Sequence, residues 1–125
     1  MESIKHIIQS KDLFLIAGPC VIENADLTFE IASKLKEVTS QHSIPFVFEA
    51  SYKKENRTKL NSFTGPGINE GIQILKHIRD ELSIPITTDV HNTKDIQQIA
   101  NIIDIIQIPA FLCRQTDMLI AAAKT

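Results

Sequence analysis

The stretch Ile102-Ile103-Asp104-Ile105-Ile106-Gln107-Ile108 indicates the fold class more clearly than any other part of the chain. It is an apolar run interrupted only by Asp104 and Gln107, and it lacks the clean alternation of a strand with one solvated face. Such runs are typical of parallel strands that are buried on both faces. Three further short apolar runs precede it, at residues 13–17, 46–48 and 84–88. We therefore expect four parallel strands.

The segments between these strands have the pattern of helices. Apolar residues recur every three or four positions in two of them, at Leu27, Ile31, Leu35 and Val38 and at Ile68, Ile72, Leu75, Ile78 and Leu82. This spacing puts apolar side chains on one helical face. We expect Asn24 and Asn69 to cap these two helices, and Asn92 with Asp95 to form a capping box for a third. A fourth helix is predicted from Thr116 to Ala123.

Four strand–helix units fit two α/β architectures, an open doubly wound sheet or the first half of a (β/α)8 TIM barrel. Ser43-Ile44-Pro45-Phe46 and Ser83-Ile84-Pro85-Ile86 repeat the same entrance to a strand at an interval that fits one such unit. No G-x-G-x-x-G sequence follows a strand, so the dinucleotide-binding version of the open sheet is unsupported. The placement of the polar residues favours the half barrel.

The composition argues against several classes of protein. The chain has 125 residues, 43% of them hydrophobic, and a net charge of −2 without a long basic run, which argues against nucleic acid as a partner. Its first residues lack the apolar segment of a secretory signal, and its apolar runs are too short to span a membrane. Two cysteines make no disulfide framework. We expect a cytoplasmic protein with no membrane partner.

Each predicted strand is followed by residues that can bind ligands or take part in chemistry. They are Cys20 after the first strand, Glu49, Ser51, Lys53, Lys54, Asn56 and Arg57 after the second, Asp89 and His91 after the third, and Gln107 and Arg114 after the fourth. The carboxyl ends of parallel strands lie on one side of a sheet, so we expect these groups to converge there. Barrel enzymes have their active sites at that end.

These residues also have purely structural interpretations. The alternatives are a small buried hydrophobe for Cys20, a solvated loop face for Lys53, Lys54 and Arg57, support of the next loop for Asp89, and capping or packing for His91. Cys113 lies in the apolar string Ala110-Phe111-Leu112 and is interpreted as structural.

The segment from Ser51 to Gly67 is harder to explain structurally. It has about 17 residues with no helix or strand pattern, and long loops inside compact domains are usually functional. It has four cationic side chains, those of Lys53, Lys54, Arg57 and Lys59, against the single carboxylate of Glu55. Arginine offers a planar fork to phosphate oxygens and lysine a point charge. The loop therefore indicates an enzyme that binds phosphorylated substrates.

Four segments together resemble the 3-deoxy-D-manno-octulosonate 8-phosphate synthases. They are Ile16-Ala17-Gly18-Pro19-Cys20-Val21-Ile22-Glu23, Lys54-Glu55-Asn56-Arg57-Thr58 with its continuation Ser62-Phe63-Thr64-Gly65-Pro66-Gly67, Thr88-Asp89-Val90-His91, and Ile106-Gln107-Ile108-Pro109-Ala110-Phe111-Leu112-Cys113-Arg114-Gln115-Thr116-Asp117. The resemblance runs from about residue 13 to Thr125. It implies that residues 1–125 are the N-terminal half of one barrel domain, which usually assembles as a homotetramer.

The implied reaction condenses phosphoenolpyruvate with arabinose 5-phosphate and water, releases phosphate and serves lipopolysaccharide synthesis. The resemblance assigns the sugar phosphate to Asn56, Arg57 and Thr58. It assigns phosphoenolpyruvate to Ser51, Lys54, Gln107 and the backbone of Ala110, adds Asp89 and His91 to the substrate-binding set, and places Arg114 near a subunit interface. It makes Cys20 a ligand of a divalent metal (zinc, iron or manganese), because family members with cysteine at this position use one.

Two departures from the family pattern leave alternatives open. The family has lysine where this chain has Glu49, and it continues for another half barrel beyond Thr125. One alternative is the related phosphoenolpyruvate aldol synthase that makes the seven-carbon precursor of aromatic compounds. The other is a catalytically inactive half barrel that only binds a partner. The Lys54-Glu55-Asn56-Arg57-Thr58 string favours the eight-carbon enzyme.

Overall fold

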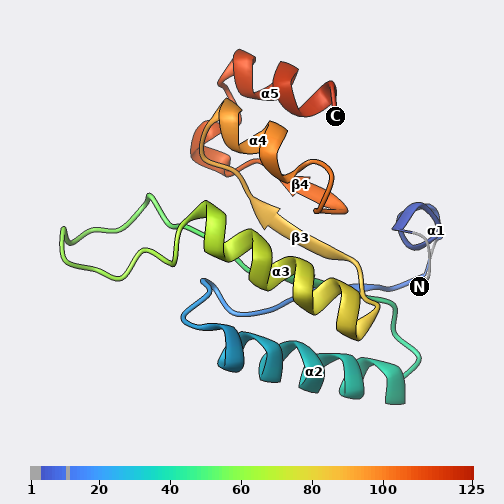
Figure 1. Cartoon of the computed structure of the whole chain (residues 1–125). Helices are drawn as coiled ribbons and strands as arrows, with labels where there is room; N and C mark the ends of the chain where they lie inside the picture. The colour runs from blue at the N-terminus through green and yellow to red at the C-terminus, as the bar shows by residue number, and fades with distance from the viewer. Residues whose placement is uncertain (1–3, 11) are drawn as a thin grey trace.

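The structure, a computed structural model, describes residues 4–10 and 12–125. Strands and helices alternate along most of the chain (Figure 1). The elements are α1 (Ile4–Gln9), β1 (Leu15–Ala17), α2 (Ala25–Gln41), β2 (Phe46–Glu49), α3 (Ile68–Leu82), β3 (Ile86–Asp89), α4 (Thr93–Ile99), β4 (Ile105–Gln107), the 3-10 turn η1 (Ala110–Leu112) and α5 (Thr116–Ala123). The alternation of strand and helix confirms the predicted α/β class.

The order of the strands distinguishes the two architectures. All pairs are parallel and the order in space, β1-β2-β3-β4, is the order in sequence. A doubly wound sheet reverses its strand order at a switch point, whereas a (β/α)8 barrel adds each strand beside the previous one. Helix α2 packs on α3, and α4 packs on α5. The structure therefore has the arrangement of half a (β/α)8 barrel, as the sequence predicts.

The hydrophobic core lies between the sheet and the helices. Phe46 and Phe48 of β2 belong to it, together with Ile86 of β3 and with Ile72 and Leu75 of α3. Side chains alternate along a strand, so Val47 and Glu49 of β2 and Thr87 and Asp89 of β3 face away from the helices. This second face is the one that would line the inside of a closed barrel, and the candidate site lies at its carboxyl end.

The ends of the strands differ from the predicted ones for identifiable reasons. The third strand begins at Ile86 rather than at Ile84, because Pro85 has no N–H to donate to a neighbouring strand. The Asp104 carboxylate accepts the backbone N–H of Ile86 at 2.9 Å, and the fourth strand begins only after it, at Ile105. The predicted first strand is also shorter, since it begins at Leu15.

Two of the three predicted helix caps are found. The Asn24 side chain accepts a hydrogen bond from the backbone N–H of Leu27. The Asn92 side chain accepts hydrogen bonds from the backbone N–H groups of Lys94 and Asp95. The prediction for Asn69 was wrong: α3 begins after Gly67, and the Asn69 side chain instead accepts a hydrogen bond from Gln98 at 2.9 Å. Asp95 accepts the hydroxyl of Tyr52 rather than completing a capping box.

Helix α1 was not predicted from the sequence. It buries Ile7, which lines a cavity of about 180 Å³ with Pro45 of the β2 entrance and Ile84 of the β3 entrance. These contacts lie at the amino ends of the strands, opposite the candidate site. Among the described helices, none is both long and apolar enough to cross a membrane.

Candidate functional site at the carboxyl ends of the strands

The strand register brings three of the predicted site residues to one level. Asp89 pairs with Gln107 across β3 and β4, and Glu49 pairs with Thr87 across β2 and β3. Ser51 follows Glu49 by two residues, as Asp89 follows Thr87, so Ser51 and Asp89 lie at the same level and on the same face. Ser51 and Asp89 are buried, whereas Gln107 is exposed at the free edge of β4. The predicted convergence of these residues at one end of the sheet is therefore present in the backbone.

Lys54, Asp89 and His91 form a compact polar cluster. The Lys54 ammonium lies 3.8 Å from Asp89 Oδ2, and His91 Nε2 lies 3.5 Å from the same oxygen. His91 Nε2 is also 2.7 Å from the carbonyl oxygen of Lys53. A carbonyl only accepts hydrogen bonds, so this contact assigns the proton to Nε2. In neutral His91, Nδ1 is then an acceptor.

Three buried polar atoms in this region have no hydrogen-bond partner among the described residues: Ser51 Oγ, Asp89 Oδ1 and His91 Nδ1. Buried polar groups are nearly always paired, with protein, water or ligand, because an unpaired one loses its hydration without replacement. Asp89 is the last residue of β3, and Ser51 and His91 each follow a strand end by two residues. This concentration leaves polar atoms at the carboxyl ends of these strands that a polar ligand can pair with.

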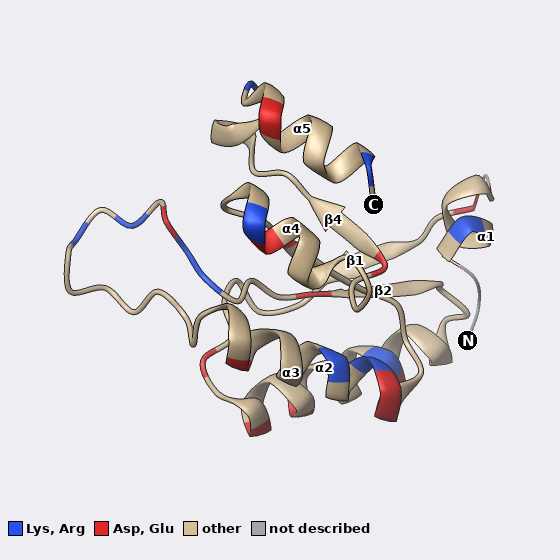
Figure 2. Cartoon of the chain, turned by 45° about the horizontal axis from the view of Figure 1, so that its top comes forward, with Lys and Arg blue, Asp and Glu red and all other residues tan. Residues whose placement is uncertain are grey.

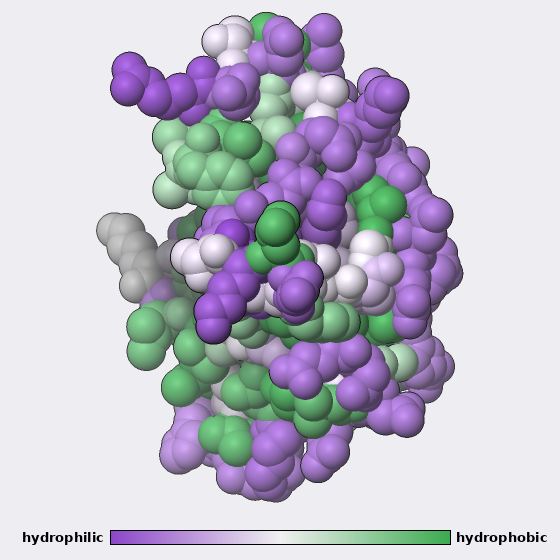
Figure 3. All heavy atoms as spheres, turned by 90° about the vertical axis from the view of Figure 1, so that its left-hand side faces the viewer, coloured by the Kyte–Doolittle hydropathy of each residue, from purple (hydrophilic) through white to green (hydrophobic). Residues whose placement is uncertain are grey.

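The loop between β2 and α3 projects from this end of the sheet (Figure 1). Its charged residues are mainly cationic and lie along one arm of the projection (Figure 2). Asn56, Arg57 and Thr58 are exposed, and Lys53 contacts Glu55 at 2.6 Å. Seen from the side to which the loop points, the surface is largely hydrophilic with smaller hydrophobic areas between (Figure 3). The predicted irregular loop is thus found, with Arg57 and Lys59 accessible to a ligand.

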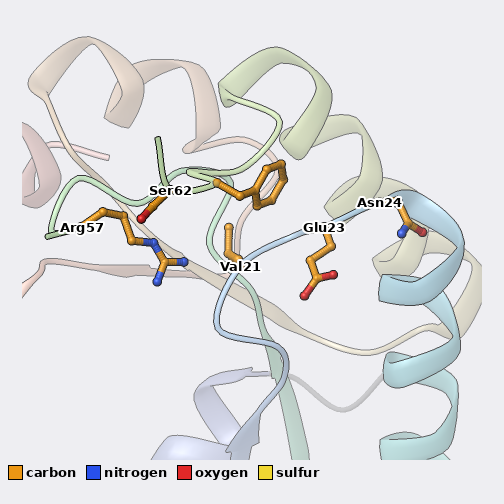
Figure 4. Close-up of a pocket in the computed structure, with 6 residues that line it drawn as sticks. Val21, Glu23, Asn24, Arg57 and Ser62 are labelled. Atoms are coloured by element: carbon orange, nitrogen blue, oxygen red, sulfur yellow. The ribbon is translucent and has the colours of Figure 1, made fainter. Parts of the chain in front are cut away.

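A pocket of about 560 Å³ lies between this loop and the segment that follows β1. It is lined by Val21, Glu23, Asn24, Arg57, Ser62 and Phe63. Arg57 and Ser62 come from the loop, and Glu23 approaches on the other side of Val21 (Figure 4). The pocket thus offers one guanidinium, one hydroxyl and one carboxylate, a set that suits a phosphorylated sugar with free hydroxyl groups.

The two cysteines are both exposed. The structural interpretation of Cys20 as a small buried hydrophobe was therefore wrong, and Cys113 is not part of the core either. Within residues 4–10 and 12–125, no group of three or more histidine, cysteine or acidic side chains could hold a metal ion. Cys20 is thus accessible for ligation but lacks enough neighbouring ligands in the described part of the chain.

The remaining predicted site residues lie beyond β4. Ala110 begins the turn η1, and Arg114 lies between this turn and α5, where it is exposed. The backbone N–H of Val90 donates to the carbonyl of Gln107, which ties the end of β4 to the residue between Asp89 and His91. Among the described residues, no side-chain hydrogen bond or ion pair joins Arg114 to the Lys54–Asp89–His91 cluster, so the role of Arg114 stays a prediction.

Sequence reasoning missed Tyr52, and it assigned Asp95 only to a capping box and not to the site. The Tyr52 side chain is fully buried beside the cluster, its hydroxyl donates to Asp95 Oδ2 at 2.7 Å, and its ring meets that of His91 edge-on at 5.6 Å. Burial, followed by the hydrogen bond to Asp95, raises the pKa of Tyr52 well above its usual range. The only signal in the sequence was the position of an aromatic residue directly between Ser51 and the lysines of the loop.

The fold and the site together define an α/β protein with barrel strand order whose ligand-binding groups gather at the carboxyl ends of the strands, as in barrel enzymes. Family comparison matches residues 2–125 to the DAHP synthetase I family, and the chain belongs to that family.

Curated relatives narrow the resemblance further. The chain is 50% identical over 115 residues to a 2-dehydro-3-deoxyphosphooctonate aldolase of Campylobacter jejuni subsp. doylei, which covers 92% of this chain and 43% of that protein. It is 53% identical over 113 residues to the protein of the same name from Koribacter versatilis, covering 90% of this chain and 41% of the relative. The Geobacter metallireducens protein of that name is 49% identical over 116 residues, covering 93% and 43%. The chain therefore spans about two fifths of the length of these relatives.

Proposed function

We propose that the protein containing this chain is a 3-deoxy-D-manno-octulosonate 8-phosphate synthase, which is the activity that its relatives' name, 2-dehydro-3-deoxyphosphooctonate aldolase, denotes. It condenses phosphoenolpyruvate with arabinose 5-phosphate and water, and it releases phosphate. The observation that carries the proposal is the group of unpaired buried polar atoms on Ser51, Asp89 and His91, beside Lys54 and beneath a cationic loop. These atoms need a polar ligand, and the loop supplies the charge for a phosphorylated one.

The carbon–carbon bond of this reaction forms when C3 of phosphoenolpyruvate attacks the aldehyde carbon of the sugar. Water adds at C2, and the phosphate on C2 leaves. Lys54 lies where it can pair with an anionic group of phosphoenolpyruvate, since its ammonium faces the cluster and its side chain is only 17% exposed. Ser51, Asp89 and His91 supply the adjacent hydrogen-bonding atoms, with Gln107 and the backbone of Ala110 completing this side of the site.

The sugar phosphate is assigned to the loop. Arg57 lines the pocket of about 560 Å³, and Asn56 and Thr58 flank it in sequence, so one segment offers a guanidinium, an amide and a hydroxyl. Charge-assisted contacts from arginine to phosphate are shorter and stronger than neutral ones. Arg114 is assigned to the interface with another subunit of a homotetramer.

The metal assignment rests on one residue. The thiol of Cys20 is exposed at the carboxyl end of β1, which fits a ligand of zinc, iron or manganese, and the other ligands of such an ion would come from residues outside the described cluster. A bound divalent ion supplies Lewis-acid activation of water or of a carbonyl oxygen. The cytoplasm is the proposed location, since phosphoenolpyruvate and sugar phosphates are produced there.

Phosphate release decides between the proposal and its alternatives. The purified full-length protein is given phosphoenolpyruvate with either arabinose 5-phosphate or erythrose 4-phosphate, and with each substrate alone. Release that requires the five-carbon sugar phosphate supports the proposal. Release that requires the four-carbon one identifies the enzyme of aromatic biosynthesis. A folded, metal-loaded protein that releases phosphate with neither sugar is the inactive binding protein, and the proposal is then wrong.

A further inference from the structure

We infer that Tyr52, through its hydrogen bond to Asp95, is the positioning residue that holds the β2–α3 loop and its Lys54 in the candidate site. The consequence for substrate binding rests on the proposed function, whereas the consequence for the order of the loop does not. The inference begins with the location of Tyr52, which is fully buried at the root of a loop whose next residues are half-exposed or exposed.

Both ends of the loop are attached at or beside Tyr52. The backbone N–H of Gly67 donates to the carbonyl of Tyr52 at 3.0 Å, and that of Lys54 donates to the carbonyl of Thr64 at 2.7 Å. These two hydrogen bonds hold the two ends of the loop together, and we call this pair of bonds the neck of the loop. The residues between them, from Glu55 to Phe63, have backbone bonds only within a short turn, Ser62 to Lys59. The neck therefore determines where the loop leaves the sheet.

Two glycines allow the chain to pack directly on Tyr52. A Cβ atom at Gly65 would lie 2.5 Å from the carbonyl oxygen of Tyr52, and one at Gly71 would lie 2.4 Å from Tyr52 Cβ. Real Cβ atoms do not approach other atoms so closely, so both positions exclude larger residues. Gly65 has a φ of +105°, which glycine adopts without strain. The β2–α3 connection is thus built around a fixed Tyr52.

The hydroxyl of Tyr52 extends this anchor to a separate helix. Its acceptor, Asp95, lies in the first turn of α4, and α4 is held in place by Ile96 and Ile99, which are both fully buried. The ring of Tyr52 meets that of His91, whose Nε2 contacts the carbonyl of Lys53. Tyr52 therefore positions the main chain at Lys53 and Lys54 in two ways. Its own backbone forms part of the neck, and its ring packs against His91, which contacts the carbonyl of Lys53. Its ring alone would fill the space, but only the hydroxyl connects it to α4.

The test uses the lysines at the base of the loop as reporters of its order. Lys53 and Lys54 lie at the partly buried base of the loop, so trypsin reaches the bonds after them faster when the base departs from its folded path, whereas Arg57 and Lys59 are exposed already. In the full-length protein, we expect Tyr52→Phe to raise the rate of cleavage after Lys53 and Lys54 at least about fivefold, because a partly buried hydrogen bond to a carboxylate is lost while the ring remains. Asp95→Ala should have the same effect. Asp95→Asn keeps an acceptor oxygen and should remain close to the wild-type rate.

The matched control is Thr39→Val, which removes a buried hydroxyl that bonds only to its own helix, at the carbonyls of Leu35 and Lys36. Equal acceleration by Thr39→Val and Tyr52→Phe would show general destabilisation and overturn the inference, as would a wild-type cleavage rate in Tyr52→Phe. If Tyr52→Phe does not fold, the comparison of Asp95→Ala with Asp95→Asn decides in the same way, because both variants leave the tyrosine ring in place.

Steady-state kinetics then separates positioning from mere stability. With Lys54 displaced, KM for phosphoenolpyruvate should rise at least about fivefold in Tyr52→Phe while kcat changes by less than about twofold. The separate variant Asp95→Asn, which keeps an acceptor for the Tyr52 hydroxyl, should have a KM close to that of wild type. Faster cleavage with an unchanged KM would support the role of Tyr52 in ordering the loop. It would contradict the part of the inference that places Lys54 at the substrate. An inactive wild-type protein overturns the proposed function and leaves the cleavage result as it stands.

Discussion

Replacement of Gly71 by alanine sets two opposing physical effects against each other. Gly71 lies inside α3, where alanine is favoured over glycine by about 1 kcal/mol on helix propensity alone. The added methyl group, however, would lie 2.4 Å from Tyr52 Cβ and 3.1 Å from Tyr52 Cα. Ordinary carbon–carbon contacts are about 3.5–4 Å long. Either α3 or the end of β2 must therefore move by about an ångström.

Neither partner can move easily. The Tyr52 backbone is held by Gly67, its side chain is fully buried and its hydroxyl is bonded to Asp95. Helix α3 has five buried residues along its inner face, among them Leu75 and Ile78. Overpacking of a rigid site costs about 1–3 kcal/mol, and the upper part of this range applies where both sides are fixed. After subtraction of the propensity gain, we expect Gly71→Ala to reduce the free energy of unfolding by about 2 kcal/mol.

Chemical denaturation of the full-length protein measures this difference. Gln73→Ala is the matched control, since Gln73 is exposed on the same helix and its replacement should change the stability by less than about 0.5 kcal/mol. Loop cleavage by trypsin should also accelerate in Gly71→Ala, because the clash is with Tyr52. A variant that is more stable than wild type by about 1 kcal/mol would show that propensity prevails, and would refute the argument that Tyr52 is rigidly held.

Four further predictions concern the site and the chain. In steady-state assays, Arg57→Ala should raise KM for arabinose 5-phosphate at least about tenfold and leave KM for phosphoenolpyruvate nearly unchanged. An equal increase in both KM values contradicts the assignment of Arg57 to the sugar phosphate. Cys20→Ala should abolish divalent-metal retention, measured by elemental analysis after dialysis; full retention shows that Cys20 is no ligand. Burial raises the pKa of Tyr52, so its contribution to stability is present below the unfolded-state value of about 10 and is lost as pH rises above it. In denaturation experiments at alkaline pH, the free energy of unfolding should therefore fall more steeply with pH for wild type than for Tyr52→Phe. Residues 1–125 expressed alone should associate, as sizing will show, and should release no phosphate, because β1 and β4 have open edges; an active monomer contradicts the half-barrel interpretation.

The fold could be predicted from the sequence to the extent that it depends on local patterns. Apolar runs located all four strands, and the spacing of isoleucine and leucine located the helices α2 and α3. Helix α1 was missed because its six residues carry too short a pattern, and only tertiary contact through Ile7 explains its burial. Asn69 was misassigned as a cap because Gly67, with a φ of +87°, lets the helix begin two residues earlier than the polar residue suggested.

The candidate site was predictable in outline and not in its connections. Parallel strands necessarily bring their carboxyl ends together, so Ser51, Asp89 and Gln107 could be grouped from the strand positions alone. The hydrogen bond between Tyr52 and Asp95 joins residues 43 positions apart, and no local pattern encodes such a pair. The same is true of the contact between His91 and the carbonyl of Lys53. Side-chain networks of this kind depend on the final packing, which sequence periodicity does not specify.

The charges of the site divide into a floor and a rim, and Glu49 makes this division clear. Glu49 and Asp89 face the same side of neighbouring strands, and within the described residues only Asp89 has a cationic partner, Lys54. The floor formed by these three side chains thus carries one more negative than positive charge. The rim, Lys53 and residues 55–59, has three cations against one carboxylate. The phosphate of the sugar is therefore attracted to the rim, whereas phosphoenolpyruvate at the floor depends on Lys54 to offset the charges of Glu49 and Asp89. The family's lysine at the position of Glu49 would make the floor positive instead. In this chain we accordingly expect the sugar phosphate to be bound by the loop, and any cation that the site takes up to be bound beneath it.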